Sequence, residues 1–279
     1  MKYLKIALVL LIVMPFAGHA QDSDTQEQKT KDKPQRAAFQ SDWLINNPTN
    51  IVNTKNTFEF SIQHRFGTMN GGNNDLIGIW APSNIRLGFN YTITDRINLG
   101  FGTTKDNRLQ DFNLKVALLR QTRSGSMPIS LTYYGNMAID ARSADNFFHS
   151  TDRFSYFNSV IIARRFSPAV SLQLVPSFSH YNLVDTGMKN DQLAVAFGGR
   201  VKVGSTMAIL FDYSQPLTQD TDNPGLSLAL EISTGSHAFQ IFVGNYKGIV
   251  PQKNYLFNPN KLANGDILIG FNITRLWNF

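Results

Sequence analysis

The stretch IRLGFNYTITDRINLGFG, residues 85–102, alternates between large apolar residues and polar or small ones on both sides of Asp95-Arg96. The apolar positions are Ile85, Leu87, Phe89, Tyr91 and Ile93, followed by Ile97, Leu99 and Phe101. Successive side chains of a β-strand point to opposite faces, so each half of the stretch has one apolar and one polar face. The stretch therefore predicts two antiparallel strands joined by a tight turn.

The same alternation returns along the rest of the chain and predicts about twelve strands in all. It is weakest over 154–165, where the run Val160-Ile161-Ile162 would face two apolar environments. The further candidate strands cover 58–63, 112–118, 129–134, 154–165, 170–181, 192–202, 206–214, 226–233, 238–245 and 267–279.

The connections between these segments are alternately short and long. Asp95-Arg96, Ser124-Gly125-Ser126 and Ser167-Pro168 are tight turns, whereas 140–152 and 246–265 are long links. Short turns at one end and long loops at the other are the layout of a transmembrane β-barrel. An even strand count puts both ends of the barrel on the short-turn side, which would be periplasmic, with the long loops outside the cell.

A lipid bilayer explains why the strands keep one apolar face. Backbone groups in hydrocarbon must pair internally, so a membrane sheet has to close on itself. After its first twenty residues the chain has no run of the roughly 20 apolar residues that a spanning helix needs. The predicted fold is all-β, a transmembrane antiparallel β-barrel of about 12 strands with short periplasmic turns and long extracellular loops. A soluble all-β periplasmic protein is the competing architecture, because it too would show alternation.

The start of the chain has the features of a secretory signal peptide over 1–20. Two lysines precede a short apolar core over 6–16, and the small residues Gly18 and Ala20 stand where a cleavage site requires them. We expect this segment to be removed when the protein is exported.

Residues 21–50 are polar, mixed in charge and poor in apolar side chains. We expect them to form a flexible periplasmic leader, with the barrel covering 51–279. The small apolar patch Trp43–Ile45 either docks onto another surface or leads into the first strand.

The last strand ends the chain on an apolar face that includes Trp277 and Phe279. An apolar alternating strand with a terminal Phe resembles the signal that the outer-membrane barrel assembly machinery recognises. Arg275 interrupts this face. We therefore expect an outer-membrane location, with membrane lipid and the barrel assembly machinery as partners.

The composition excludes several other classes of protein. The chain has no Cys, which rules out disulfides and thiolate metal sites. Its formal net charge of +6 comes from Lys and Arg that are scattered rather than clustered, which argues against a nucleic-acid partner. No cofactor motif is present, and none is expected.

Ionisable residues on the polar face of the strands are expected to line the lumen. They would be solvated in a water-filled pore, or paired across a tighter interior, because buried charges need partners. Many neighbouring inward positions, such as Gly198, Ala208 and Ala229, are small and leave room for a solute path or an inserted loop. The predicted lumen-lining set is Glu59, Arg65, Arg86, Asp111, Lys115, Arg200, Lys202, Asp212 and Glu231.

Histidine and serine residues give little support to metal binding or catalysis. The histidines have no ligand spacing of the His-x-x-x-His kind. Ser179 and His180 are adjacent in a strand and must point to opposite faces. The pairs His149-Ser150 and Ser236-His237 lie outside strands, but no orienting acid can be assigned to either. We expect no catalytic residue and no metal site.

Three stretches resemble a bacterial family of outer-membrane β-barrels of unknown function: FEFSIQHRFG at 58–67, APSNIRLG at 81–88 and DRINLGFG at 95–102. The resemblance is clearest over 57–140 and implies a barrel and its location, but no activity. The leading hypothesis is a passive channel or an uptake barrel for a small solute. The alternatives are a structural barrel that binds a partner through its loops or leader, and a membrane-embedded hydrolase.

Overall fold

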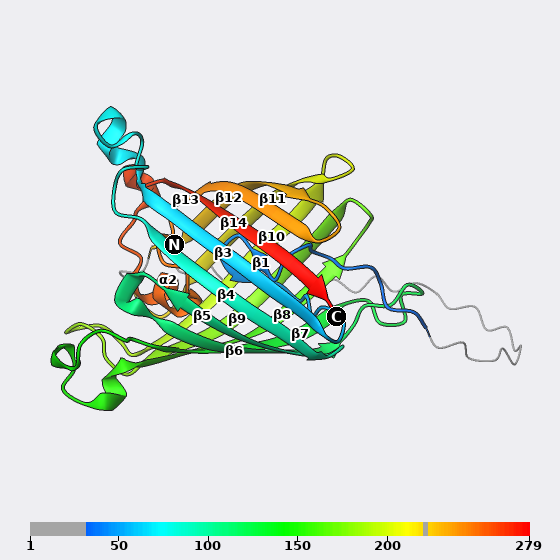
Figure 1. Ribbon diagram of the computed structural model, residues 1–279, viewed down its shortest axis with the longest axis horizontal. Helices are drawn as coiled ribbons and strands as arrows, with labels where there is room; N and C mark the ends of the chain where they lie inside the picture. Colours follow the sequence, from blue (N-terminus) through cyan, green and yellow to red (C-terminus); the bar gives the residue numbers. More distant parts are fainter. Residues whose placement is uncertain (1–31, 220–222) are drawn as a thin grey trace, which may run out of the picture. The chain divides into compact units, whose positions relative to one another are not determined.

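Twelve strands of the computed structural model pair edge to edge into one closed antiparallel barrel (Figure 1). The structure describes residues 32–219 and 223–279, so the predicted signal peptide lies outside the described residues. The barrel strands are β3 (Thr57–Thr68), β4 (Asn84–Thr94), β5 (Ile97–Thr104), β6 (Gln110–Leu119), β7 (Ser130–Ile139), β8 (Phe154–Arg165), β9 (Val170–Tyr181), β10 (Asp191–Lys202), β11 (Met207–Pro216), β12 (Gly225–Ser233), β13 (His237–Gly244) and β14 (Leu268–Asn278).

Each strand pairs with its neighbours in the sequence, and β14 closes the ring on β3. The closing register places Trp277 opposite Phe58 and Ile273 opposite Ile62. Closure leaves no exposed sheet edge, which would otherwise template aggregation. The predicted all-β barrel is confirmed, and the bounds of β8 and β9 are those that the alternation predicts.

The burial pattern of the strands is the reverse of that in a soluble protein. In β3 the polar residues Glu59, Ser61 and Gln63 are buried inside, while the apolar residues between them face outward. In β12 the outward Leu228 is 55% exposed. Polar residues inside and an apolar belt outside are the arrangement of a barrel that sits in lipid.

The two ends of the barrel differ as the connections predict. One end carries long loops with the short helices η1 (Met69–Asp75), η2 (Asp106–Arg108), η3 (Ala144–Asn146), η4 (Ser150–Arg153), α2 (Pro251–Phe257) and η5 (Leu262–Asn264). The other end carries short turns, apart from a longer projection over 120–129. The predicted turn Ser124-Gly125-Ser126 is at the tip of this projection, where Thr122 N–H donates to the carbonyl of Met127. Thr122 also forms a bridge with Pro34.

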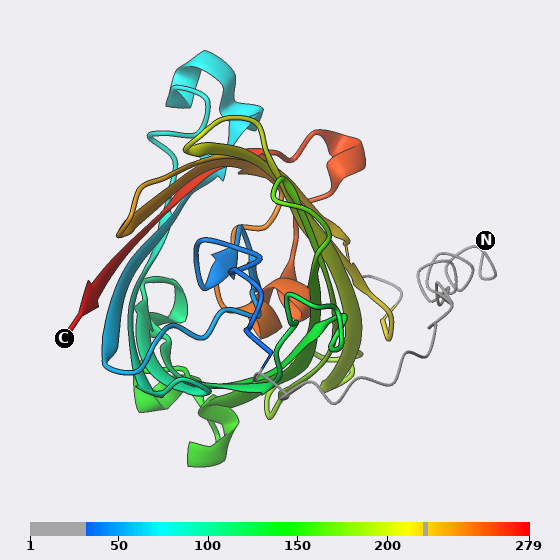
Figure 2. The same cartoon turned by 90° about the vertical axis from the view of Figure 1, so that its right-hand side faces the viewer.

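Residues 33–56, here called the lumenal segment, run inside the barrel (Figure 2). The segment enters at the short-turn end, where Gln35 N–H donates to the carbonyl of Gln121, and returns there, where Lys55 N–H donates to Asp95. Between these points β1 (Trp43–Leu44) and β2 (Asn47–Pro48) form a small hairpin.

The structure thus differs from the flexible leader that composition suggests over 21–50. Residues 38–49 are buried, apart from the exposed Gln40, although half of the residues in this range are polar. The reason is that the polar barrel wall supplies the partners that a polar segment needs, so ordering does not require an apolar core. The first barrel strand begins at Thr57, one residue before the predicted 58–63.

Among the helices of the described residues, none is both long enough and apolar enough to cross a membrane.

Candidate functional site: the occupied lumen

The tip of the lumenal hairpin is held in a strained backbone conformation by the barrel wall. Ile45 has a φ of 57°, in the left-handed region that a β-branched residue rarely adopts. Its carbonyl accepts hydrogen bonds from Arg65 Nη2 at 3.1 Å and Asn272 Nδ2 at 2.9 Å. Strain of this kind costs about 1–3 kcal/mol and persists only where surrounding contacts impose it. The wall therefore binds this turn specifically.

Asp212 of β11 binds the other side of the same turn. Its carboxylate accepts from the Asn46 backbone N–H at 3.0 Å and from Asn47 Nδ2 at 2.7 Å. Asn47 also donates to Ser214, and Asn46 donates to Ser227. All these groups are buried. Each hydrogen bond between the segment and the wall therefore replaces a hydrogen bond that the wall group would otherwise make to water.

A second ionic contact joins the segment to the opposite wall. Lys115 Nζ lies 3.3 Å from Asp42 Oδ1, and Asn90 donates to the other oxygen of Asp42 at 3.1 Å. Glu59 lies nearby and accepts from Asn53 at 3.3 Å. Removing one partner of such a buried pair destabilises the fold, because the other charge is left buried without a partner and without water.

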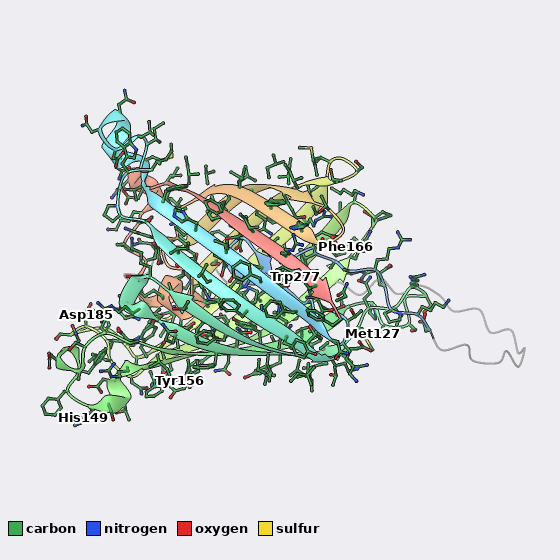
Figure 3. The ribbon with its side chains drawn as sticks, viewed as in Figure 1. Met127, His149, Tyr156, Phe166, Asp185 and Trp277 are labelled. Carbon is green, nitrogen blue, oxygen red and sulfur yellow. The ribbon has the colours of Figure 1, made fainter. Side chains whose placement is uncertain are left out.

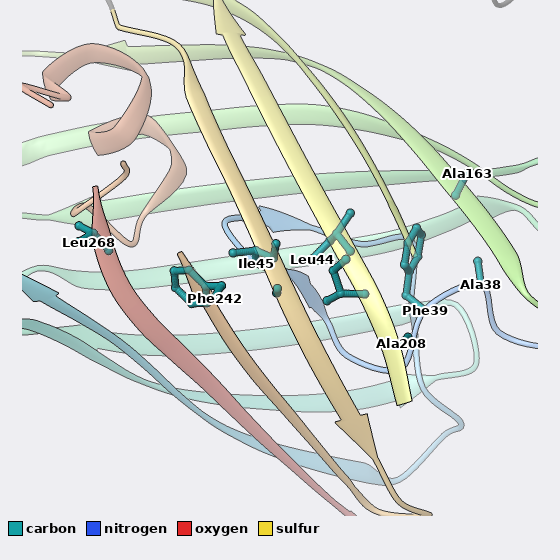
Figure 4. Packing of buried hydrophobic residues seen from close by; sticks show 10 residues of the cluster. Ala38, Phe39, Leu44, Ile45, Ala163, Ala208, Phe242 and Leu268 are labelled. Carbon is teal, nitrogen blue, oxygen red and sulfur yellow. The ribbon is translucent and has the colours of Figure 1, made fainter. Parts of the chain in front are cut away.

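Apolar side chains of the segment pack where the wall is small. A Cβ on Gly198 would lie 2.5 Å from Leu44 Cδ2, so only glycine allows this close approach. Phe39, Leu44 and Ile45 belong to one buried cluster with wall residues (Figure 4). The wall members of that cluster are Ala163, Ala208, Leu210, Ala229, Phe242 and Leu268.

The long loop before β14 enters the lumen from the other end. Its helix α2 is buried, and Gln252 Nε2 donates to Asn136 Oδ1 of β7 at 2.8 Å. Tyr255 of α2 donates its hydroxyl hydrogen to Asn47 Oδ1 of the lumenal segment. The two insertions therefore meet inside the barrel.

Cavities lie on either side of this contact, and the following pair lies nearest the two insertions. One, of about 400 Å³, lies towards the short-turn end between the lumenal segment and wall residues such as Thr132 and Leu276. The other, of about 220 Å³, lies towards the loops and is lined by Asp140, Arg153 and Phe257 among others. The two cavities share no lining residue, and the lumenal hairpin and α2 lie between them.

Eight of the nine predicted lumen-lining residues are buried inside the barrel, and Lys202 is exposed at the short-turn mouth. Glu59, Arg65, Lys115 and Asp212 contact the lumenal segment as described above. The remaining buried residues are Arg86, Asp111, Arg200 and Glu231.

Two ion pairs lie within the wall itself. Arg86 forms a two-point pair with Asp111, with N–O distances of 2.8 Å, and Arg200 Nε lies 2.7 Å from Glu231. The lumen is therefore a tight, paired interior in this structure rather than an open aqueous one.

The wall pair Arg86–Asp111 gives a stability prediction. Asp111→Ala leaves the guanidinium buried and unpaired, so we expect the barrel to lose about 3–5 kcal/mol of unfolding free energy. Urea unfolding in lipid vesicles measures the loss. Asp140→Ala, which breaks the more exposed pair with Arg142 in a loop, should cost about 1 kcal/mol or less. Equal losses in the two variants would contradict the prediction.

Neither of the Ser-His pairs 179–180 and 236–237, among the residues that the structure describes, has the geometry of a hydrolytic site. Ser236 Oγ lies 3.2 Å from His237 Nδ1, but the other ring nitrogen faces Arg275 at 2.7 Å. A guanidinium can only donate, so His237 Nε2 accepts this hydrogen bond, and the neutral ring then carries its hydrogen on Nδ1. Nδ1 therefore faces Ser236 as a donor, not as the acceptor that a general base must be. His180 does pair with an acid, Asp191, while its neighbour Ser179 is buried on the inner face. Within the described residues, no cluster of three His, Asp or Glu side chains could hold a metal ion.

Of the two expectations for the patch Trp43–Ile45, the structure shows docking onto another surface, here the barrel wall. Its neighbours Asn46 and Asn47 are lumenal partners that no sequence pattern predicts. One sequence feature could have indicated an inserted segment: apolar residues at strand positions that face the otherwise polar interior of the barrel. Ile161 and Phe157 point inward and pack in one cluster with Trp43. The weak alternation over 154–165 therefore marks the place where the inserted segment supplies a second apolar environment.

The fold is similar to that of solved outer-membrane channels. A NanC porin structure superposes with a TM-score of 0.50 at 7% identity, covering 80% of this chain and 99% of that one. The COG4313 outer membrane channel from Pseudomonas putida F1 gives 0.50 at 12% identity, with 81% and 97% covered. These likenesses concern the fold, and no curated protein matches the sequence.

A family model described as "Membrane bound beta barrel domain (DUF5777)" matches residues 39–277. The match includes most of the lumenal segment as well as the barrel, and it confirms the resemblance to a barrel family of unknown function. The chain belongs to this family of membrane-bound β-barrels.

Proposed function

We propose that the protein is an outer-membrane channel for small polar solutes, held closed by its own lumenal segment. The observation that carries the proposal is that a separate stretch of chain fills the lumen. In a small barrel that conducts no solute, such as one of eight strands, the side chains of the wall itself fill the interior. Here the wall has small residues such as Gly198 and Ala208, and residues 38–50 occupy the space.

The polarity of the wall supports passage of a polar solute once the segment moves. The wall groups that hold the segment are guanidinium, ammonium, carboxylate and amide side chains, all of which water can satisfy equally well. They include Arg65, Lys115, Asp212 and Asn272. An open lumen would therefore be hydrated and of mixed charge, which suits a small uncharged or zwitterionic solute.

The outer-membrane location is part of the same proposal. The apolar belt suits a bilayer, and the last strand ends in Trp277 and Phe279, which we propose as the signal for the barrel assembly machinery. The short-turn end, where Gln35 N–H donates to the carbonyl of Gln121 as the lumenal segment enters the barrel, would then face the periplasm.

A disulfide between the segment and the wall tests the proposal. Ser41 Oγ and Thr274 Oγ1 lie 2.9 Å apart, and the chain has no cysteine of its own. Ser41→Cys with Thr274→Cys should form a bond that fixes the segment in place. In a planar bilayer the oxidised protein should show no channel openings, and reduction should restore openings at the wild-type frequency.

Each single Cys variant serves as the control, since it makes the same change without the cross-link. Openings that persist in the fully cross-linked protein would contradict the proposed role of the segment. A barrel that stays closed under reduction, and after the segment is deleted, would favour the alternative of a barrel that binds a partner.

A further inference from the structure

Positive charge collects on the exposed short-turn end of the barrel. Cationic side chains on or beside its turns include Lys202 and Arg165 at the ends of β10 and β8. Six others are here called the basic rim: Lys55, Arg96, Arg120, Arg123, Arg164 and Arg275. From residue 33 onward, Asp95 is the acidic side chain at this end. The loop end, by contrast, mixes the two signs, with Asp75, Asp106 and Asp152 near Lys105, Arg108 and Arg153.

Two members of the basic rim face the lipid rather than the lumen. Arg164 stands two residues after the outward Ile162 at the end of β8, and therefore shares its outer face. Arg275 stands in the same way two residues after the outward Ile273 near the end of β14. A charge on the lipid face costs about 2–4 kcal/mol at the bilayer midplane but close to zero at its interface. These two residues therefore mark the depth of the lipid headgroups.

Aromatic rings accompany both outward arginines. The Arg164 guanidinium lies 5.0 Å from the centre of the Phe166 ring, and that of Arg275 lies 4.8 Å from the Trp277 ring. Figure 3 shows Phe166 and Trp277 at the same end of the barrel, away from His149 and Asp185 in the loops. Aromatic rings prefer the headgroup level, which agrees with the depth of the arginines.

Four of the rim cations form no ion pair with a carboxylate of residues 33–219 or 223–279, although the charge of Asp95 acts on Arg120. These four are Arg96, Arg120, Arg164 and Arg275. Arg96 instead donates to the carbonyls of Ala117 and Leu118, which bring it close to Arg120. Partial burial and then the charge of Arg96 lower the pKa of Arg120. A bound anion would relieve this repulsion.

We propose that the basic rim binds the phosphate groups of anionic phospholipids in the leaflet that faces the short-turn end. Arg275 with Trp277 and Arg164 with Phe166 each combine a cation at headgroup depth with an aromatic ring at the acyl boundary. The inference goes beyond the proposed channel function, since it holds whether or not the lumen opens.

Fluorescence quenching of Trp277 tests the proposal locally. The chain has three tryptophans, so Trp43→Phe with Trp80→Phe leaves Trp277 as the reporter. The protein is placed in phosphatidylcholine vesicles that contain equal fractions of brominated phosphatidylglycerol or brominated phosphatidylcholine. One cation near a membrane surface enriches an anionic lipid by roughly fivefold, so the brominated phosphatidylglycerol should quench several times more strongly.

The parent protein here is the variant in which Trp277 is the reporter. In it, high salt should lower the ratio of the two quenching constants. Adding Arg275→Gln should bring this ratio close to one. Lys189→Gln with Lys261→Gln, which removes two exposed charges at the loop end, should leave the ratio unchanged. Equal quenching by the two lipids in the parent protein would overturn the proposal, as would a ratio that Arg275→Gln does not change. Using the ratio removes any direct effect of the substitution on Trp277 fluorescence.

Discussion

Deleting residues 33–50 is expected to convert a closed barrel into one with stepwise, salt-dependent conductance in a planar bilayer. The deletion removes the lumenal hairpin with the contacts of Asp42, Ile45 and Asn47 to the wall. It leaves a twelve-strand interior lined by small and polar side chains, wider than an eight-strand interior that side chains fill. Water can then satisfy the wall groups that the hairpin satisfied before.

The control for the deletion must separate an open pore from a misfolded barrel. Heat-dependent migration on a gel and the β-sheet circular dichroism spectrum establish that the barrel has formed. A synthetic peptide of residues 33–50, added to the deletion variant, should block the conductance in a dose-dependent way. A scrambled peptide of the same composition should not. A folded deletion variant that conducts no ions would contradict the proposed closing role of the segment and favour the alternative of a barrel that binds a partner.

Asp212→Ala is expected to raise the open probability of the full-length channel on the order of 100-fold. Asp212 accepts hydrogen bonds from the Asn46 N–H and the Asn47 amide when the segment is in place. Hydrogen bonds to a charged group are worth about 1.5–3 kcal/mol each, and every 1.4 kcal/mol is a factor of ten in an equilibrium. In the open barrel, water would satisfy the same donors, so the loss falls on the closed state.

Single-channel recordings at fixed voltage measure the open probability of this variant. Thr92→Val is the matched control, because the Thr92 hydroxyl accepts a hydrogen bond from Asn98 on the neighbouring strand of the wall. It should change the stability of the barrel slightly and leave the open probability as it is. If Asp212→Ala gives the same open probability as the wild type, the Asp212 contacts do not hold the segment closed.

The barrel itself could be predicted from the sequence because strand alternation is a local property. Each outward Leu, Ile or Phe faces lipid directly, so the period of two along the chain is not altered by distant contacts. For this reason the bounds 154–165 and 170–181 agree with the observed strands. The alternation also predicts the inward direction of Glu59, Arg86 and Asp111, since it follows from their position between outward residues.

The content of the lumen could not be predicted in the same way. Residues 33–50 look like a flexible leader because their composition is polar, and composition carries no information about distant partners. Asp42 meets Lys115, and Asn47 meets Asp212 and Tyr255, only after the barrel has closed. These contacts join positions as much as 208 residues apart in the sequence.

The sequence by itself determined the membrane-facing surface, the strand order and the two unlike ends of this protein. Each of these depends on alternation and turn chemistry within a short stretch. Only the tertiary structure decided that the interior is occupied and which wall groups hold the inserted segment. The physical reason is that burying a polar segment is favourable only when its hydrogen-bond partners are already arranged around it, and those partners come from many different strands.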